Sequence, residues 1–235
     1  MPPFQWLVQI AMLCRDVYQD TPVTKALHVD WIEDFSAGDD YGCAYITPGT
    51  VYIAVRGTDS WDDWRSNFKL LGRANWHGMS VHRGFEKPAR AMERRVMEII
   101  SNQPGKRIVF CGHSRGGAIA LLLAIAAEQH FPLQVIQCVT YGQPRVSTTD
   151  QVRNRFYGEH IRVQNGSDAV CRWPKIGFGH AGTCLYLTNR GKKQWVIDPS
   201  WLTQAYDRAL TLIQHASDHS LNEYIEELLQ CARSA

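Results

Sequence analysis

The sequence lacks the features that mark several large classes of protein. No uninterrupted apolar run approaches the roughly 20 residues that a membrane-spanning helix requires, and the mean hydropathy is −0.28. Charge of one sign is also missing, because 25 Lys and Arg stand against 23 Asp and Glu, which leaves a net charge of +2. We therefore expect neither a transmembrane protein nor one that binds nucleic acid through a broad basic surface.

Cysteine pairs and a secretory leader are absent as well. The seven cysteines are odd in number, widely spaced and never arranged as Cys-x-x-Cys, so they predict neither a disulfide framework nor a zinc site. We expect most of them to be buried small hydrophobic residues. The N-terminus has no basic start, apolar stretch or small-residue cleavage site, which predicts a cytoplasmic protein, or a secreted one if a leader has been removed.

Repeats, low-complexity stretches and Pro/Gly/Ser-rich linkers are missing too, so nothing divides the 235 residues. With 45% hydrophobic and 11% aromatic residues, the chain has the composition of a folded globular protein. We expect one domain, residues 1–235, and the sequence gives no indication of the oligomeric state.

The hydrophobic pattern alternates between strands and helices in the second half of the chain. A short apolar strand, a buried helix and another strand in succession indicate a mainly parallel sheet, preceded by a hairpin that turns at Pro48-Gly49. The predicted fold is therefore α/β, with three layers and an antiparallel leading edge. Helices are expected at 5–18, 118–127 and 221–231, and a further helix is expected to have Pro88 in its first turn and to stop at 104–105. The expected strands are 41–46, 51–55, 108–111, 135–141, 161–163, 185–187 and 195–197.

One motif carries a specific chemistry. Gly112-His113-Ser114-Arg115-Gly116 follows the buried strand directly and opens the buried helix, which is the context that a nucleophile elbow, Gly-x-Ser-x-Gly, requires. The tight turn would raise the hydroxyl of Ser114 at the carboxyl end of the sheet, beside a helix N-terminus that favours developing negative charge. The alternative is a glycine-lined turn with an inert serine.

A serine nucleophile needs a base and an acid, and the order Ser, Asp, His expected for this elbow places both later in the chain. Asp168 follows the strand 161–163 and is the fitting acid, although an Asx turn would also explain it and Asp198 is a rival. His219 lies in a polar loop before the last predicted helix and is the fitting base, with His180 and His215 as rivals.

Six stretches of the chain, in this order, resemble the class 3 lipase family, which contains the fungal triacylglycerol lipases and their bacterial relatives. The resemblance spans about residues 41–229. The stretches are Val55-Arg56-Gly57-Thr58 with Asp63-Trp64, Val81-His82-Arg83-Gly84-Phe85, the elbow, Thr140-Tyr141-Gly142-Gln143-Pro144-Arg145-Val146, Val163-Gln164-Asn165-Gly166-Ser167-Asp168-Ala169-Val170, and Asp218-His219-Ser220 followed by Tyr224.

This resemblance implies an α/β-hydrolase fold and a triad of Ser114, Asp168 and His219. It also implies an oxyanion hole made of the backbone N–H of Arg115 and the N–H and hydroxyl of Thr58. A hydroxyl that satisfies the local backbone at the strand end is the alternative for Thr58.

The same comparison suggests which residues contact the substrate. Trp61 stands where the fungal enzymes carry an amphipathic lid, although it could instead pack on the sheet edge. Trp76 is expected beside the substrate groove, with surface packing as the alternative. His82 and His113 complete the expected substrate-binding set, whereas Arg56 and Arg145 are expected to stabilise the fold.

Two positions depart from the family pattern. Cys171 stands where many relatives have proline. Arg115 replaces a small or apolar residue, and a guanidinium beside the acyl groove would disfavour long acyl chains unless a nearby carboxylate neutralises it. Asp59, Asp62 and Asp63 are the candidates for that role.

The sequence therefore predicts a serine carboxylic ester hydrolase that acts on acylglycerols or small acyl esters, with lipid-interface contact possible in principle. This chemistry needs neither a metal nor an organic cofactor. The alternatives are a phospholipase A1, a feruloyl-type esterase, or a catalytically silent binding protein on the same scaffold.

Overall fold

The computed structural model describes residues 3–19, 27–58, 72–132, 134, 136–166, 168–188, 194–210 and 219–234. Because 59–71, 189–193 and 211–218 lie outside them, the predicted lid segment, the loop between the last two strands and the segment before His219 are not part of the description.

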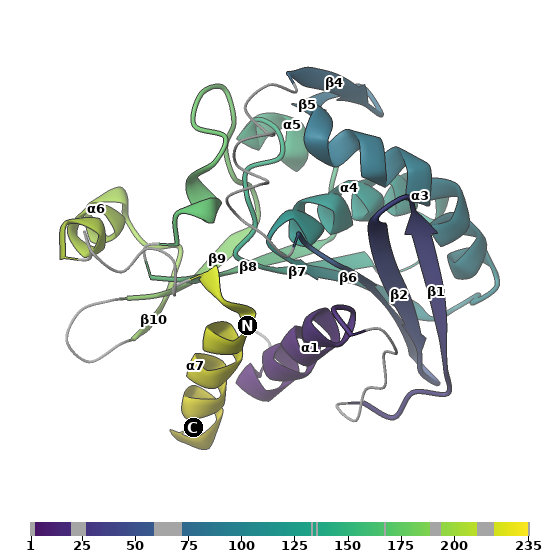
Figure 1. Ribbon diagram of the computed structural model, residues 1–235, viewed down its shortest axis with the longest axis horizontal. Helices are drawn as coiled ribbons and strands as arrows, with labels where there is room; N and C mark the ends of the chain where they lie inside the picture. The colour runs from purple at the N-terminus through teal and green to yellow at the C-terminus, as the bar shows by residue number, and fades with distance from the viewer. Residues whose placement is uncertain are drawn as a thin grey trace.

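An eight-stranded sheet runs through the middle of the molecule (Figure 1). Its order is β1-β2-β3-β6-β7-β8-β9-β10, with parallel pairing from β3 to β9 and antiparallel pairing of the strands at both edges. This agrees with the predicted mostly parallel sheet and its antiparallel leading edge. The strands are β1 (Trp31–Ala37), β2 (Asp40–Ile46), β3 (Thr50–Val55), β6 (Arg107–His113), β7 (Ile136–Tyr141), β8 (Glu159–Asn165), β9 (Thr183–Leu187) and β10 (Trp195–Ile197).

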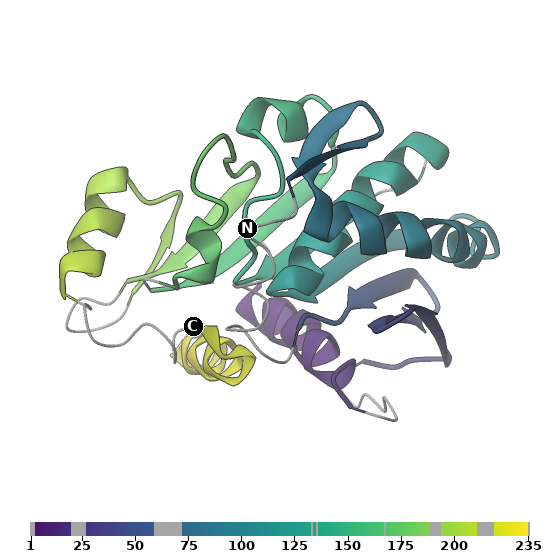
Figure 2. The same ribbon diagram turned by 45° about the horizontal axis from the view of Figure 1, so that its top comes forward.

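Helices cover both faces of this sheet (Figures 1 and 2). On one face lie α3 (Arg83–Ser101) and α4 (Arg115–His130), and on the other lie α1 (Phe4–Asp16) and α7 (Leu221–Ser234). The short α5 (Thr149–Arg153) and the hairpin of β4 (Arg73–Trp76) and β5 (Met79–His82) lie near α3. A 3₁₀ turn, Val170–Arg172, follows β8, and α6 (Trp201–Leu210) projects beyond β10.

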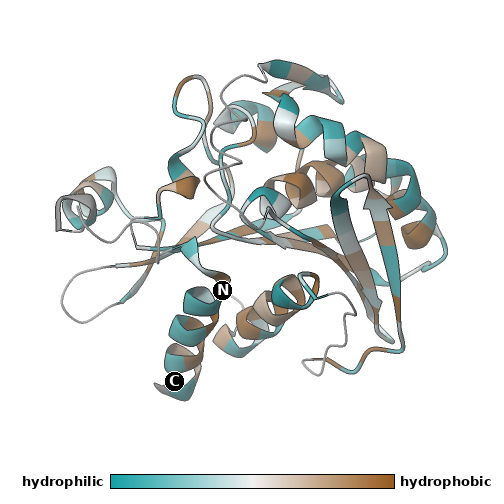
Figure 3. Ribbon diagram, viewed as in Figure 1, coloured by the Kyte–Doolittle hydropathy of each residue, from teal (hydrophilic) through white to brown (hydrophobic). Residues whose placement is uncertain are grey.

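The two faces form separate hydrophobic cores because successive strand residues point to opposite sides. In β3, for example, Ile53 belongs to the core under α3 and α4, whereas Tyr52 and Ala54 belong to the core under α1 and α7. Helix α4 is apolar on every side (Figure 3), and each residue from Gly116 to Ala127 is buried, as the sequence predicted for this helix. This burial fixes the helix that begins immediately after Ser114.

Helix α3 begins earlier than predicted. The expectation was that Pro88 occupies the first turn, but the helix starts at Arg83, and His82 caps it by accepting a hydrogen bond from the Gly84 N–H at 3.1 Å. Proline cannot donate to the carbonyl four residues before it. The carbonyl of Gly84 instead accepts a bond from the guanidinium of Arg115 at 3.5 Å, so a contact from another helix compensates for Pro88.

The remaining differences are elements that the pattern did not reveal. β1 was not predicted, and neither were the β4-β5 hairpin and α6. The cysteines behave as expected: six are buried, Cys231 is half-buried, and none is in a disulfide.

Candidate active site

Ser114 occupies a sharp turn between β6 and α4. Its backbone has φ 57° and ψ −131°, a conformation that is strained for a residue with a side chain. The turn is possible only because its flanking residues are glycines. A Cβ on Gly112 would lie 2.5 Å from the backbone of Gly116, and a Cβ on Gly116 would lie 2.2 Å from the carbonyl oxygen of Val55. The strand-to-helix context and the glycine requirement predicted for this motif are both present.

The predicted nucleophile, base and acid lie in one hydrogen-bonded chain. The Nε2 atom of His219 is 2.9 Å from the Oγ of Ser114, and its Nδ1 is 2.9 Å from the Oδ2 of Asp168. The carboxylate is fully buried and the serine is almost fully buried, whereas the histidine ring is partly exposed. The three side chains come from the segments that follow β6 and β8 and from the second residue before α7, at the carboxyl edge of the parallel strands.

The surroundings of Asp168 favour one tautomer of His219. One carboxylate oxygen accepts from the backbone N–H of Val170 at 2.8 Å, and the other accepts from the hydroxyl of Tyr224 at 2.8 Å. Since an ionised carboxylate only accepts hydrogen bonds, Nδ1 of His219 carries the proton and Nε2 is left basic toward the serine. The contact with the N–H of Val170 is the Asx turn that was the alternative explanation for Asp168. The same side chain therefore both stabilises its loop and contacts His219.

Tyr224 is a contributor that sequence reasoning did not assign to any role. Its hydroxyl donates to Asp168 and accepts from the backbone N–H of Asn165 at 3.0 Å, which ties α7 to the end of β8. Burial raises the pKa of this tyrosine, and the nearby charge of Asp168 raises it further, so the hydroxyl keeps its proton. The only sequence signal was its place five residues after His219 in the family pattern.

Gly142 allows the acid and the base to approach each other. It has φ 59°, and a Cβ at this position would lie 2.9 Å from Oδ2 of Asp168 and 3.0 Å from the ring of His219. A side chain would therefore enter the space where the two groups meet, which explains why glycine follows β7.

His113 lies directly against the base. Its ring centroid is 4.7 Å from that of His219, and its Nε2 donates to the backbone carbonyl of His219 at 2.8 Å. Its Nδ1 then accepts from the hydroxyl of Tyr18 at 3.2 Å, and that hydroxyl accepts from the Gly57 N–H at 3.1 Å. Burial, followed by the proximity of His219, lowers the pKa of His113 to about 3, which keeps the ring neutral and both bonds intact.

This arrangement corrects the expectation that His113 contacts the substrate. Both ring nitrogens are occupied within the protein and the side chain is nearly inaccessible, so His113 positions other groups. Tyr18, which sequence reasoning missed, comes from the segment after α1 and had no motif to mark it.

The expected oxyanion donors lie on the two segments that meet at Ser114. Arg115 is the first residue of α4, where backbone N–H groups have no partner within the helix. Thr58 follows Gly57, whose position is so close to the elbow that a Cβ there would lie 3.3 Å from the Cβ of Ser114. The N–H of Gly57 itself is engaged by Tyr18, which leaves Thr58 as the candidate donor of this loop.

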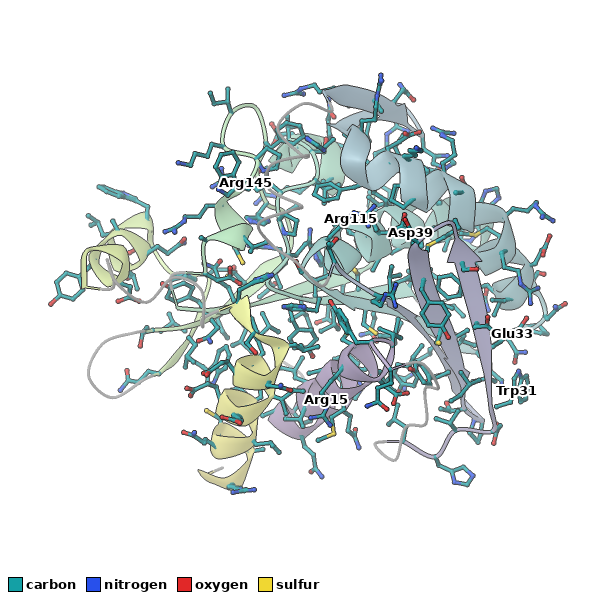
Figure 4. The ribbon with its side chains drawn as sticks, in the orientation of Figure 1. Arg15, Trp31, Glu33, Asp39, Arg115 and Arg145 are labelled. Carbon is teal, nitrogen blue, oxygen red and sulfur yellow. The ribbon has the colours of Figure 1, made fainter. Side chains whose placement is uncertain are left out.

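The side chain of Arg115 reaches the start of β2, where Figure 4 labels the neighbouring Asp39. It forms a two-pronged ion pair with Asp40 at the start of β2, and also reaches the carbonyl of Gly84. The expected carboxylates Asp59, Asp62 and Asp63 lie outside the described residues. The partner found is Asp40, which is distant in sequence and therefore gave no signal.

Two further expectations about substrate contacts are wrong in this structure. Trp76 is completely buried, and its Nε1 donates to the carbonyl of Leu122 in α4 at 3.1 Å, so it is a core residue and not a groove wall. His82 is buried as the cap of α3, with its ring beside Phe85 and Phe178. Trp61 lies outside the described residues.

The rival acid and bases are placed elsewhere or not described. Asp198 has φ 44° and accepts from the backbone N–H of Cys184 at 2.7 Å, which makes it part of the β9-β10 connection. His180 donates to the carbonyl of Cys171 at 2.6 Å. His215 lies outside the described residues. The described part of the chain contains no group of three His, Cys, Asp or Glu side chains that could hold a metal ion.

Several known proteins resemble this chain in sequence or in fold. The family model described as Lipase (class 3) matches residues 52–178, which is more than half of the chain. The chain is 32% identical over 149 residues to secreted mono- and diacylglycerol lipase 1 of Fusarium solani, covering 57% of this chain and 42% of that protein. It is 24% identical over 225 residues to phospholipase A1-II 2 of Oryza sativa subsp. indica, covering 78% and 54%. The chain thus spans about half the length of the curated relatives it matches.

Among solved structures, a lipase from Rhizopus microsporus var. chinensis superposes with a TM-score of 0.78, at 19% identity, over 92% of this chain and 85% of that one. This likeness shows the α/β-hydrolase fold. None of the described helices is both long and apolar enough to cross a bilayer. The expected cytoplasmic location gains no support from the relatives, since the name of the Fusarium protein describes a secreted enzyme.

The family model covers the segment from β3 through the elbow and the Asp168 loop, and the fold places the matched motifs around one sheet edge. On these grounds the chain belongs to the class 3 lipase family.

Proposed function

We propose that this protein is a serine carboxylic ester hydrolase that cleaves acylglycerols or small acyl esters through an acyl-enzyme on Ser114. The observation that carries the proposal is the continuous chain of 2.9 Å contacts from the serine Oγ through His219 to Asp168. Membership of a lipase family supports the same reaction class. We further propose that residues 1–235 act as one hydrolase domain, since eight strands drawn from Trp31 to Ile197 share one central sheet.

In the proposed reaction, the Oγ of Ser114 forms a bond to the ester carbonyl carbon while its proton passes to Nε2 of His219. The carbonyl oxygen becomes an oxyanion, which the N–H of Arg115 and the N–H or hydroxyl of Thr58 stabilise. The bond to the leaving alcohol then breaks, and the imidazolium returns the proton to that alcohol. Water repeats the sequence on the acyl-enzyme, which releases the acid and restores the serine.

Asp168 stabilises the imidazolium that forms in each half of this cycle. Its burial makes the interaction strong, because little water screens it. Tyr224 and the backbone N–H of Val170 hold the carboxylate so that one oxygen faces Nδ1 of His219. His113 restrains the backbone of the base and, through Tyr18, the oxyanion loop.

The test is covalent labelling with a fluorophosphonate together with hydrolysis of p-nitrophenyl butyrate. The wild-type protein is expected to label at one serine and to hydrolyse the ester, and Ser114→Ala is expected to lose both activities. Ser101→Ala is the matched control, because Ser101 is exposed at the end of α3 and its loss removes a hydroxyl far from the elbow. Labelling of the Ser114→Ala protein at the wild-type level would refute the proposed nucleophile. A wild-type protein that neither labels nor turns over would indicate a silent binding protein.

Phospholipase A1 activity is the second candidate, and the similarity to a rice phospholipase A1 favours it. Ser114, Asp168 and His219 would serve both reactions. The two activities would therefore differ in which polar substituent of the glycerol the protein accepts. A panel of p-nitrophenyl esters of increasing chain length, a diacylglycerol and a phosphatidylcholine, compared by kcat/KM, decides between them; a feruloyl ester in the same panel tests the remaining alternative.

A further inference from the structure

Helix α6 presents its large apolar side chains to solvent. Trp201, Leu202 and Tyr206 are 72%, 60% and 54% exposed, although side chains of this size gain the most free energy when they leave water. Figures 1 and 2 both show α6 beyond the β10 edge of the sheet, apart from the helices that cover the two faces of the sheet. We call the surface formed by these three side chains the α6 face.

The polarity of α6 is the reverse of that of an ordinary surface helix. With about 3.6 residues per turn, the three residues of the α6 face fall within an arc of about 140° of the helix circumference. On the other side of the helix, Asp207 is completely buried, and Gln204 lines a hollow of about 370 Å³ to which Arg162 also contributes. An amphipathic helix normally turns its apolar stripe toward the core. Helix α6 instead turns polar residues inward and its aromatic residues outward.

The start of α6 is firmly attached to the sheet. The hydroxyl of Ser200 accepts from the backbone N–H of Thr203 at 3.1 Å and caps the helix. The backbone N–H of Asp198 donates to the carbonyl of Cys184 in β9 at 2.8 Å, and the carboxylate of Asp198 accepts from the Cys184 N–H at 2.7 Å. Trp201 follows Ser200 directly, so its exposure belongs to a capped helical turn that is anchored to the sheet.

The α6 face is smaller than a stable contact with a second copy of this chain requires. Specific protein interfaces use about 20 to 30 residues on each partner. Helix α6 has 10 residues in all, and its polar side already faces its own protein. A fluid lipid surface needs no matching shape, because lipid molecules rearrange around the side chains that enter between them. The size of the α6 face therefore favours a lipid surface as its occupant.

The chemistry of the three side chains favours the same occupant. Tryptophan and tyrosine combine an apolar ring with a polar N–H or O–H, and both are enriched at the depth of lipid headgroups. Leu202 lies beside Trp201 and supplies an aliphatic group of the kind that helices lying on a membrane insert at the acyl boundary. Residues 201–206 carry no charge, so this attraction requires no anionic lipid.

We propose that the α6 face docks this protein on a lipid surface, with α6 lying among the headgroups and the sheet remaining in water. The contact is peripheral, since none of the described helices can span a bilayer. Helix α6 contributes none of the three residues of the proposed triad, so docking and chemistry are separate. The benefit of docking rests on the proposed function, because poorly soluble acylglycerols collect at lipid surfaces.

The test measures partitioning onto vesicles of a dialkyl ether analogue of phosphatidylcholine, which contains no ester for the protein to cleave. We expect the wild-type protein to bind. The double variant Trp201→Gln, Leu202→Gln is expected to lower the partition coefficient about tenfold or more, because two large apolar side chains no longer enter the lipid. The conservative variant Trp201→Phe, Leu202→Ile is expected to retain binding. Cosedimentation at increasing lipid concentration gives each coefficient.

The double variant Trp31→Gln, Ile32→Gln is the matched control. Trp31 and Ile32 are also an exposed tryptophan followed by an aliphatic residue, but they lie on β1, at the opposite edge of the sheet from β10. The ammonium of Lys106 lies 5.4 Å from the centre of the Trp31 ring, so this pair already has a polar neighbour. We expect the control to bind vesicles as the wild type does. Both double variants should keep the wild-type kcat/KM for soluble p-nitrophenyl butyrate.

A second copy of the chain is the other occupant, and sedimentation velocity tests it. Self-association that the Trp201/Leu202 variant abolishes, with vesicle binding unchanged, would assign the α6 face to a dimer and overturn the proposal. A wild-type protein that does not bind the vesicles, or equal losses in the test and control variants, would also overturn it. Failure of the proposed function gives a different result, namely no fluorophosphonate labelling and no ester hydrolysis. Vesicle binding still decides the docking proposal in that case, since it requires no turnover.

Discussion

The two helical layers of this protein contribute to the site in opposite ways. The α3 and α4 layer packs on the sheet through an almost wholly apolar core. Because α4 begins directly after Ser114, this packing fixes the position of the serine. The α1 and α7 layer supplies hydroxyl groups, with Tyr18 following α1 and Tyr224 within α7, and both reach the polar groups of the site. Substitutions in the first layer should therefore change stability, and substitutions in the second should change turnover.

The largest effect is expected at Asp168, the carboxylate to which Tyr224 of the second layer donates. Asp168→Asn should lower kcat for p-nitrophenyl butyrate about 10⁴-fold, because the amide favours the wrong imidazole tautomer and cannot stabilise the imidazolium. Asp198→Asn is the matched control, since that carboxylate serves the β9-β10 connection. If the control proves the more damaging change in kcat, the acid has been assigned to the wrong aspartate.

A core substitution tests the first layer. Ile99→Ala in α3 should lower the free energy of unfolding by about 2 to 5 kcal/mol, because it leaves a cavity in a fully buried cluster. We expect kcat/KM at a temperature where the variant is folded to equal that of the wild type. Urea denaturation and steady-state kinetics on one preparation measure both quantities. A matching fall in kcat/KM would contradict the division between the layers.

Two tyrosine substitutions test whether hydroxyl groups on the α1 and α7 side of the sheet affect turnover. Tyr224→Phe removes a hydrogen bond to the ionised Asp168 and should lower kcat about tenfold, which corresponds to about 1.4 kcal/mol. Tyr141→Phe removes a buried bond to the carbonyl of Leu7 on the same face and should affect stability alone. Identical kinetics for the two variants would mean that the hydroxyl of Tyr224 matters only for packing.

The pH dependence of stability follows from buried histidines around the sheet edge. Burial, with a smaller contribution from Arg162, lowers the pKa of His160 to about 3, whereas the unfolded chain titrates near 6.5. Between these values the unfolded chain binds a proton that the folded protein does not, so stability is complete above about pH 6.5 and decreases as the pH falls, by about 1.4 kcal/mol per pH unit for this residue.

His160→Gln should therefore reduce the slope of unfolding free energy against pH, while the glutamine amide can still bond to Gln143 as Nε2 of the histidine does. Exposed His28→Gln should leave the slope as in the wild type. Urea denaturation at pH 7, 6 and 5 provides the measurement. A steeper slope in the His160 variant would reverse the inferred direction.

The smallest effect is expected at Arg115. The sequence suggested that its guanidinium disfavours long acyl chains, but the ion pair with Asp40 directs it toward β2. Arg115→Leu should leave the ratio of kcat/KM for butyrate and octanoate esters within about twofold of the wild type, since pocket changes of this size otherwise shift selectivity tenfold or more. A larger shift would place the guanidinium beside the acyl groove during turnover.

The sequence predicted those parts of the fold and site that local pattern encodes. The apolar strand, the glycines and the buried helix around Ser114 form a continuous signal over twenty residues, and chain order then limited the partners to a few candidates. The roles of Tyr18 and Asp40 and the burial of Trp76 depend on contacts between residues 39 to 95 positions apart in the chain. Such contacts leave no periodicity or motif, so only the folded arrangement reveals them.

Helix α7 packs against α1, so the first and last helices of the described chain lie side by side. His219, the proposed base, lies two residues before α7 begins. During synthesis on the ribosome, the proposed nucleophile Ser114 and the proposed acid Asp168 therefore emerge before His219, the proposed base. The proposed triad is incomplete until His219 has been synthesised and α7 has packed beside α1. Under the proposed function, completion of folding is therefore the condition for activity.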